Sequence, residues 1–143
     1  MAEPDQTWLQ RDFLAPGMVL IAQGDRTGKL YVLRSGEVEV ERDGKFVLAT
    51  RTAGSIFGEM SLLLDIPHSA TVRAVTDTEV FIIDNALAML EANPGWLLQI
   101  ARLLAQRVNA TTALLAAKDA EETEKQSFVL PQNILAQWSD PMV

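Results

Sequence analysis

A glycine followed by a glutamate, in the middle of the chain, could form part of a ligand site. Gly58 allows a close approach to the backbone because glycine has no Cβ atom, and Glu59 follows it directly. The apolar run Met60–Leu64 predicts a helix of one to two turns. Free amides at the N-terminus of a helix favour phosphate, whereas the carboxylate of Glu59 would repel phosphate and accept a sugar hydroxyl. One interpretation is recognition of an anion and a diol; the other is an ordinary turn.

The residues after this run add polar groups to the same hypothesis. Pro67 predicts the end of the helix, and His68, Ser69 and Ala70 follow it. Together they offer an imidazole, a hydroxyl and backbone amides, all of which can hydrogen-bond to an anion. A plain surface loop would also accommodate these residue types, so both interpretations stay open.

The composition excludes several kinds of chemistry. The chain has 143 residues with no Cys and one His, so disulfides, thiolate metal sites and zinc sites with several imidazoles are excluded. No nucleophile–base pair can be drawn from these residues, so we expect no catalytic residue, no metal, no cofactor and no enzyme.

The charge of the chain bears on its partners. Twelve Lys and Arg stand against 19 Asp and Glu, a net charge of −7. Proteins that bind nucleic acid carry a basic footprint, so nucleic acid is not an expected partner. No secretory signal is visible, and no run reaches the ~18 apolar residues that cross a bilayer. We therefore expect a soluble cytoplasmic protein.

Most of the chain before residue 84 has the pattern of short strands. Glu37–Glu41 alternates polar and apolar residues, and Asp43-Gly44 predicts a hairpin after it. The sequence predicts an α+β fold, with an antiparallel β-roll or jelly-roll barrel (double-stranded β-helix) over residues 15–84. Residues 1–14 are predicted to form a helical segment on its N-terminal side.

The C-terminal part changes to a helical pattern over residues 85–118. Ala86–Ala92 forms one predicted helix, and a second starts near Pro94 and continues without a breaker to Lys118. An a/d seam follows this second helix: Leu97, Ala101, Leu104, Val108, Thr111 and Leu115. It predicts a homodimer through residues 95–118; packing of the helix on its own barrel is the alternative.

The remaining residues, 119–143, are predicted to be an acidic linker followed by an apolar tail. The tail, residues 126–143, holds several large apolar side chains, among them Phe128 and Trp138. It could dock back on the domain or bind a protein partner, and the sequence does not separate these alternatives.

Two motifs give the chain a family resemblance. They are Gly54-x-x-Phe57-Gly58-Glu59-Met60-Ser61-Leu62 and Pro67-x-Ser69-Ala70-Thr71-Val72-Arg73-Ala74. Within residues 54–72 they resemble the phosphate-binding cassette of cyclic nucleotide-binding domains, and the opening strands match that family too. The resemblance covers about residues 13–118. The long helix resembles that of the bacterial catabolite activator (CRP/FNR) group, although we expect no helix-turn-helix domain after it.

This resemblance implies a ligand, cAMP or cGMP, and a set of site residues. Glu59 would accept the ribose 2′-hydroxyl, and the backbone amides of the cassette would hold the cyclic phosphate. The long helix would supply base contacts. The implied ligand-binding residues are Phe57, Gly58, Glu59, Met60, Ser61, His68, Ser69, Ala70, Thr111 and Thr112.

One position departs from the family pattern. The family usually has Arg, which pairs with the phosphate, where this chain has His68. Arg supplies a permanent charge and a planar fork, whereas His is often neutral at pH 7. The expected function is therefore a regulatory sensor that signals by rearranging its helices. The alternatives are a degenerate fold, with His68 on a surface loop, that serves in dimerisation or docking, or a fragment of a CRP/FNR-type transcription regulator.

Overall fold

The computed structural model describes residues 9–118 together with residues 133 and 136. The chain divides after Pro94 into two compact units, Met1–Pro94 and Gly95–Val143. The elements in chain order are β1 (Leu9–Leu14), β2 (Val19–Ile21), β3 (Leu30–Ser35), β4 (Val38–Arg42), β5 (Lys45–Thr50), β6 (Ile56–Phe57), α1 (Glu59–Leu64), β7 (Thr71–Ala74), β8 (Thr78–Ile83), α2 (Ala86–Ala92) and α3 (Pro94–Lys118).

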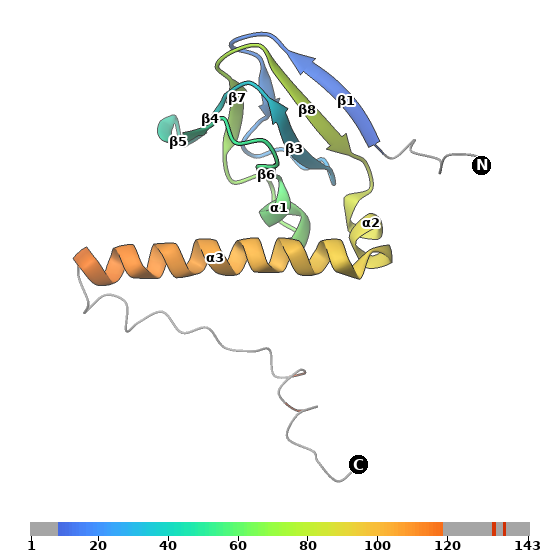
Figure 1. Cartoon of the computed structure of the whole chain (residues 1–143), viewed down its shortest axis with the longest axis vertical. Helices are drawn as coiled ribbons and strands as arrows, with labels where there is room; N and C mark the ends of the chain where they lie inside the picture. The colour runs from blue at the N-terminus through green and yellow to red at the C-terminus, as the bar shows by residue number, and fades with distance from the viewer. Residues whose placement is uncertain (1–8, 119–132, 134–135, 137–143) are drawn as a thin grey trace. The chain divides into compact units, whose positions relative to one another are not determined.

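Two antiparallel four-stranded sheets make up most of the first unit (Figure 1). Their strand orders are β1-β8-β3-β6 and β2-β7-β4-β5. One apolar core draws side chains from both sheets: Leu14, Tyr31, Leu33, Val80 and Ile82 from the first, and Ile21, Val38, Val72 and Ala74 from the second. The inward faces of the two sheets therefore meet, which confirms the predicted antiparallel β-roll and the α+β class.

Local alternation explains why these segments form strands. Along β8 the residues are buried and half-buried in turn, with Val80 fully buried. In β4 the side chain of Val38 is buried, while Glu39 and Glu41 remain partly accessible and pair with Arg73 of β7. The hairpin between β4 and β5 turns at Asp43 and Gly44, which have φ of 53° and 77°.

The N-terminal segment is a strand, so the predicted helix over residues 1–14 is wrong for its described part. Residues 9–14 form β1, which pairs antiparallel with β8 from Leu9 opposite Ile83 to Leu14 opposite Thr78. The apolar spacing of this segment fits a helix face, but β8 offers a row of backbone partners that no local pattern reveals. Residues 1–8 lie outside the described residues.

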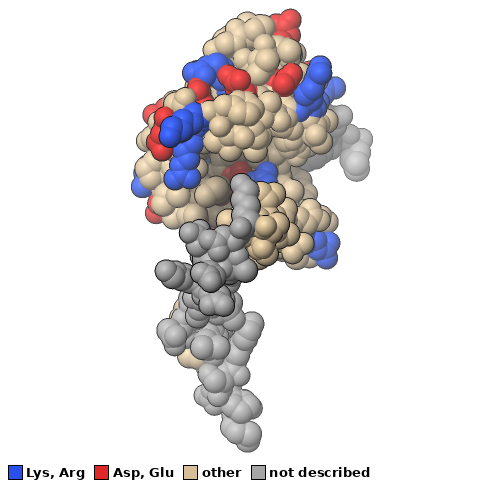
Figure 2. Space-filling model, turned by 90° about the vertical axis from the view of Figure 1, so that its left-hand side faces the viewer, with Lys and Arg blue, Asp and Glu red and all other residues tan. Residues whose placement is uncertain are grey.

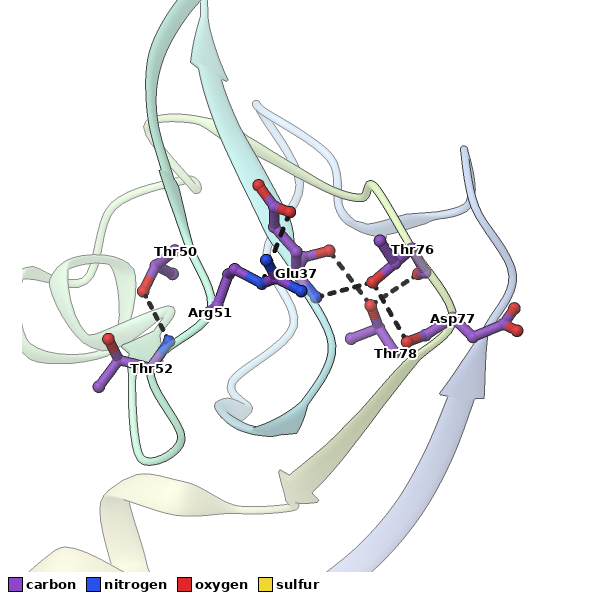
Figure 3. A network of polar contacts seen from close by, with 7 residues as sticks. All are labelled: Glu37, Thr50, Arg51, Thr52, Thr76, Asp77 and Thr78. Atoms are coloured by element: carbon purple, nitrogen blue, oxygen red, sulfur yellow. Dashed lines mark hydrogen bonds and ion pairs between the residues drawn. The ribbon is translucent and has the colours of Figure 1, made fainter.

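Two turns are joined at one end of the first unit (Figure 3). The amide of Glu37 donates to the hydroxyl of Thr76 at 3.0 Å, and the hydroxyl of Thr78 lies 3.2 Å from the carbonyl oxygen of Glu37. Gly36, with φ of 92°, lies against the same turn, and a Cβ atom there would be 2.4 Å from the carbonyl oxygen of Asp77. The turns β3–β4 and β7–β8 are thus packed backbone to backbone.

The second unit contains α3, which runs from Pro94 to Lys118 as predicted. Several of its large apolar side chains are exposed: Trp96, Leu97, Leu98, Val108 and Leu114. Among the described residues, no helix is both long and apolar enough to cross a membrane. The predicted linker and tail over residues 119–143 lie outside the described residues, apart from residues 133 and 136.

Candidate functional site

The first arm of the site is the turn from β6 into α1. Strand β6 pairs with β3, with Phe57 opposite Tyr31, and this pairing holds the next residue, Gly58, against β3. Gly58 precedes α1 with φ of 91°. A Cβ atom at this position would lie 2.9 Å from the carbonyl oxygen of Lys29 and 3.2 Å from the ring of Tyr31. The predicted close approach at Gly58 is therefore present, and its partner is the chain itself.

Helix α1 places a carboxylate at its start. Glu59 is the first residue of α1 and is only 6% exposed. A carboxylate in the first turn is favoured by the partial positive charge at the helix N-terminus. Met60 is exposed, and the hydroxyl of Ser61 donates to the carbonyl oxygen of Ile66 beyond the helix. The helix ends at Leu64, and its C-cap Asp65 adopts the left-handed conformation with φ of 54°, so the helix stops before Pro67.

The second arm of the site follows α1 and is fastened to the loop between β2 and β3. The amide of His68 donates to the carbonyl oxygen of Asp25 at 2.8 Å, and the amide of Gly24 donates to the carbonyl oxygen of His68 at 2.9 Å. Arg26 adds an ion pair to Asp65 at 3.1 Å. The β2–β3 loop, defined here as residues 22–29, thus positions the second arm.

The side chain of His68 points into the protein. It is 5% exposed, so the interpretation of His68 as a surface loop residue is wrong. Its Nε2 atom lies 3.0 Å from the hydroxyl oxygen of Thr27, and its ring meets the ring of Tyr31 edge-on at 6.3 Å between centroids. The tight turn at Gly58 brings the first arm to the same place, since a Cβ atom there would lie 3.4 Å from His68 Cε1.

The hydrogen bonds around Thr27 define the protonation state of His68. The Thr27 hydroxyl oxygen accepts from the Tyr31 hydroxyl at 3.2 Å and from the Lys29 amide at 3.3 Å. A hydroxyl oxygen has two lone pairs, so its own hydrogen is what remains for His68, and Nε2 accepts it. An imidazole that accepts at Nε2 is neutral and carries its proton on Nδ1.

The electrostatic surroundings of His68 agree with this assignment. Desolvation by burial lowers the pKa of His68 below 6.5, and the negative charges of Asp25 and Glu59 oppose the shift. Burial is the larger effect. The imidazole is therefore neutral at pH 7.

The two arms bring together most of the predicted site residues. Residues 57–61 lie on the first arm and residues 68–70 on the second, where Ser69 and Ala70 are half-buried just before β7. Thr111 and Thr112 are exposed on α3 and belong to the second unit, so they are not part of the site that the first unit forms by itself.

Sequence reasoning missed the residues that hold His68. Asp25, Thr27 and Tyr31 come from the β2–β3 loop and from β3, and Thr27 stands 41 positions before His68. The pair Gly24-Asp25 is typical of a turn, so it indicates a loop here but not the contacts of that loop.

The sequence profile of the cyclic nucleotide-binding domain family matches residues 11–89. The chain belongs to this family. Both arms of the site lie inside the matched range, and residues 54–72, which they span, are called the cassette below. The strand at residues 9–14 is also largely within the match, in agreement with its place in the sheet.

Relatives of this cyclic nucleotide-binding domain include proteins of two kinds. The cAMP-dependent protein kinase regulatory subunit of Schizosaccharomyces pombe is 37% identical over 76 residues, which cover 53% of this chain and 18% of that protein. The cyclic AMP receptor protein of Thermus thermophilus is 30% identical over 142 residues, which cover 95% of this chain and 66% of that protein. The chain therefore spans less than a fifth of the length of the kinase subunit.

A solved structure supports the same fold. The crystal structure of the catabolite activator protein of Thermus thermophilus is similar with a TM-score of 0.67 at 31% sequence identity. The similarity covers 78% of this chain and 55% of that one. The cyclic nucleotide-binding domain described here therefore shares the fold of that protein.

Proposed function

We propose that this chain is a non-catalytic sensor that binds a 3′,5′-cyclic nucleotide, cAMP or cGMP, in the cassette. The observation that carries the proposal is the buried carboxylate of Glu59, which stands at the start of α1 beside the tight turn at Gly58. A carboxylate accepts hydrogen bonds only, so Glu59 is suited to the ribose 2′-hydroxyl. The backbone amides near Met60 and Ser61, with Ser69 and Ala70, would contact the cyclic phosphate.

Ligand binding would regulate by shifting the population of the helical elements after β8. Thr111 and Thr112 would contribute contacts to the base from α3. A protein partner for the tail at residues 126–143 remains a prediction, as that segment is outside the described residues apart from residues 133 and 136. Nucleic acid is not expected as a partner, because the chain has a net charge of −7.

The binding experiment is a thermal-shift and calorimetric titration with cAMP and cGMP. Wild type should be stabilised in proportion to the logarithm of ligand concentration above Kd. Glu59→Ala should abolish the shift. Glu91→Ala, which changes an exposed carboxylate on α2, is the matched control and should bind as wild type does. A degenerate fold predicts no shift with either nucleotide.

We also propose that the protein is a homodimer through residues 95–118. The proposal is supported by the a/d seam and by the exposure of Leu97 and Val108 on α3. Val108→Glu places a charge in the seam and should give monomers in analytical ultracentrifugation. Gln106→Glu adds the same charge outside the seam and should leave the dimer intact. A monomeric wild type at all concentrations contradicts the proposal.

A further inference from the structure

The cassette of this chain contains no permanent positive charge. Between Gly54 and Val72 there is no Lys or Arg, whereas Glu59 and Asp65 are both in this range. A cyclic phosphate carries one negative charge, and it binds most strongly where a cation is available to pair with it. In this cassette the fixed side-chain charges have the same sign as the ligand.

Three basic side chains border the cassette, and each has a carboxylate partner. The pairs are Arg26 with Asp65 at 3.1 Å, Lys29 with Asp84 at 3.5 Å, and Arg73 with Glu41. A cation with an adjacent carboxylate has the field of a dipole, which falls off faster with distance than that of a free charge. Figure 2 shows the same mixing on one face of the molecule, where basic and acidic side chains lie next to each other.

His68 does not supply the missing charge. Its Nε2 atom is occupied by Thr27 at 3.0 Å, and its ring is held against Tyr31. Burial lowers the pKa of this imidazole, so it is neutral at pH 7. The donors that remain for the phosphate are neutral backbone amides, which lack the full charge and the two-point pairing of the Arg that the family pattern has here.

From these contacts we infer that the phosphate adds little to binding at this site, which takes a neutral ribonucleoside about as well as the corresponding cyclic nucleotide. The inference rests on the proposed function, because it uses the same ribose contact at Glu59. The site offers a buried carboxylate that can accept a hydrogen bond from a ribose hydroxyl. The 2′-hydroxyl is free both in a nucleoside and in its 3′,5′-cyclic phosphate, so both can make this contact. The ligand class is thus the ribonucleoside, with or without the phosphate.

The test compares matched pairs in calorimetry with the full chain: adenosine against cAMP, and guanosine against cGMP. For the pair that binds, the cyclic nucleotide should be tighter by less than about tenfold, which corresponds to about 1.4 kcal/mol. A cyclic nucleotide tighter by tenfold or more overturns the inference and leaves the proposed function standing. If neither member of either pair binds, both proposals fail.

Two further measurements distinguish the contribution of the sugar contact to the affinity from that of the phosphate charge. Glu59→Gln should weaken the nucleoside at least as much as the cyclic nucleotide, because both lose the sugar contact and only the cyclic nucleotide is relieved of a like-charge repulsion. Raising the salt concentration from 50 to 300 mM should not weaken the cyclic nucleotide, since the three basic side chains that border the cassette are each paired with a carboxylate. A severalfold loss of cyclic nucleotide affinity in salt, with nucleoside affinity unchanged, overturns the inference.

Discussion

Thr27 and His68 lie 41 positions apart in the chain, and the Thr27 hydroxyl oxygen is hydrogen-bonded to His68 Nε2 at 3.0 Å. The same hydroxyl oxygen accepts from Tyr31 and from the backbone of Lys29. One side chain of the β2–β3 loop therefore joins the second arm of the cassette to strand β3. The position where the family pattern has a phosphate-binding cation is used here for an internal contact.

Removing this hydroxyl should destabilise the first unit. Thr27→Val keeps the shape of the side chain but leaves the Tyr31 hydroxyl and His68 Nε2 without their shared partner. The free energy of unfolding should fall by about 1–2 kcal/mol in urea denaturation. Thr27→Ser retains the hydroxyl and should lose much less. Equal losses for the two variants would show that the methyl group, and not the hydrogen bonds, matters at this position.

The stability of the protein should depend on pH through His68. Burial lowers the folded-state pKa of His68 below 6.5, whereas an unfolded chain binds the proton near that value. The stabilising contribution is therefore fully present above about pH 6.5 and is lost as the pH falls through the folded-state pKa.

The measurement is the midpoint of thermal unfolding between pH 5 and 8 for wild type and His68→Gln, which does not titrate. The difference in unfolding midpoint between wild type and the variant should shrink as the pH falls. The other titrating groups are common to both proteins, so their effects cancel in this difference. A difference in unfolding midpoint that grows in acid would show that Asp25 and Glu59 stabilise His68 as the cation instead.

Gly58 should tolerate no side chain. Gly58→Ala combines a left-handed backbone with a Cβ atom 2.9 Å from the carbonyl oxygen of Lys29, and should cost roughly 2–4 kcal/mol of stability. Gly54→Ala is the matched control: its φ is 92°, but nothing lies within 4 Å of its Cβ, so the loss should be roughly 1–2 kcal/mol. Similar unfolding midpoints in urea for the two variants would contradict the close approach at Gly58.

Gly36 should be equally restricted at the other end of the sheets. A Cβ atom there would be 2.4 Å from the carbonyl oxygen of Asp77 and 2.6 Å from the hydroxyl of Thr78. We expect Gly36→Ala to reduce Tm much more than Gly44→Ala does, because the Cβ atom at position 44 would meet nothing within 4 Å. The readout is differential scanning calorimetry, with circular dichroism to detect a chain that does not fold. Equal Tm values would disprove the packing of the two turns.

The sequence predicts what depends on neighbours in the chain. Val38 and the strands around it follow a period of two, and Asp43-Gly44 determines a hairpin locally, so both are found from the pattern. The arms of the cassette are also found, because their motifs are contiguous. Strand β1 is not, since its identity depends on pairing with β8 about 70 residues away. The burial of His68 is also not predicted, because nothing in the cassette sequence indicates its contact with Thr27.

The β2–β3 loop has a consequence beyond the cassette. Its residues Gly24 and Asp25 bind the second arm, while the carbonyl oxygen of Gly28 accepts the first amide of α2, that of Ala86, at 3.2 Å. The ion pair of Lys29 with Asp84 fastens the same stretch to the end of β8. The cassette and α2 are thus both attached to one short loop. A displacement of either element would reach the other through this loop without passing through the apolar core.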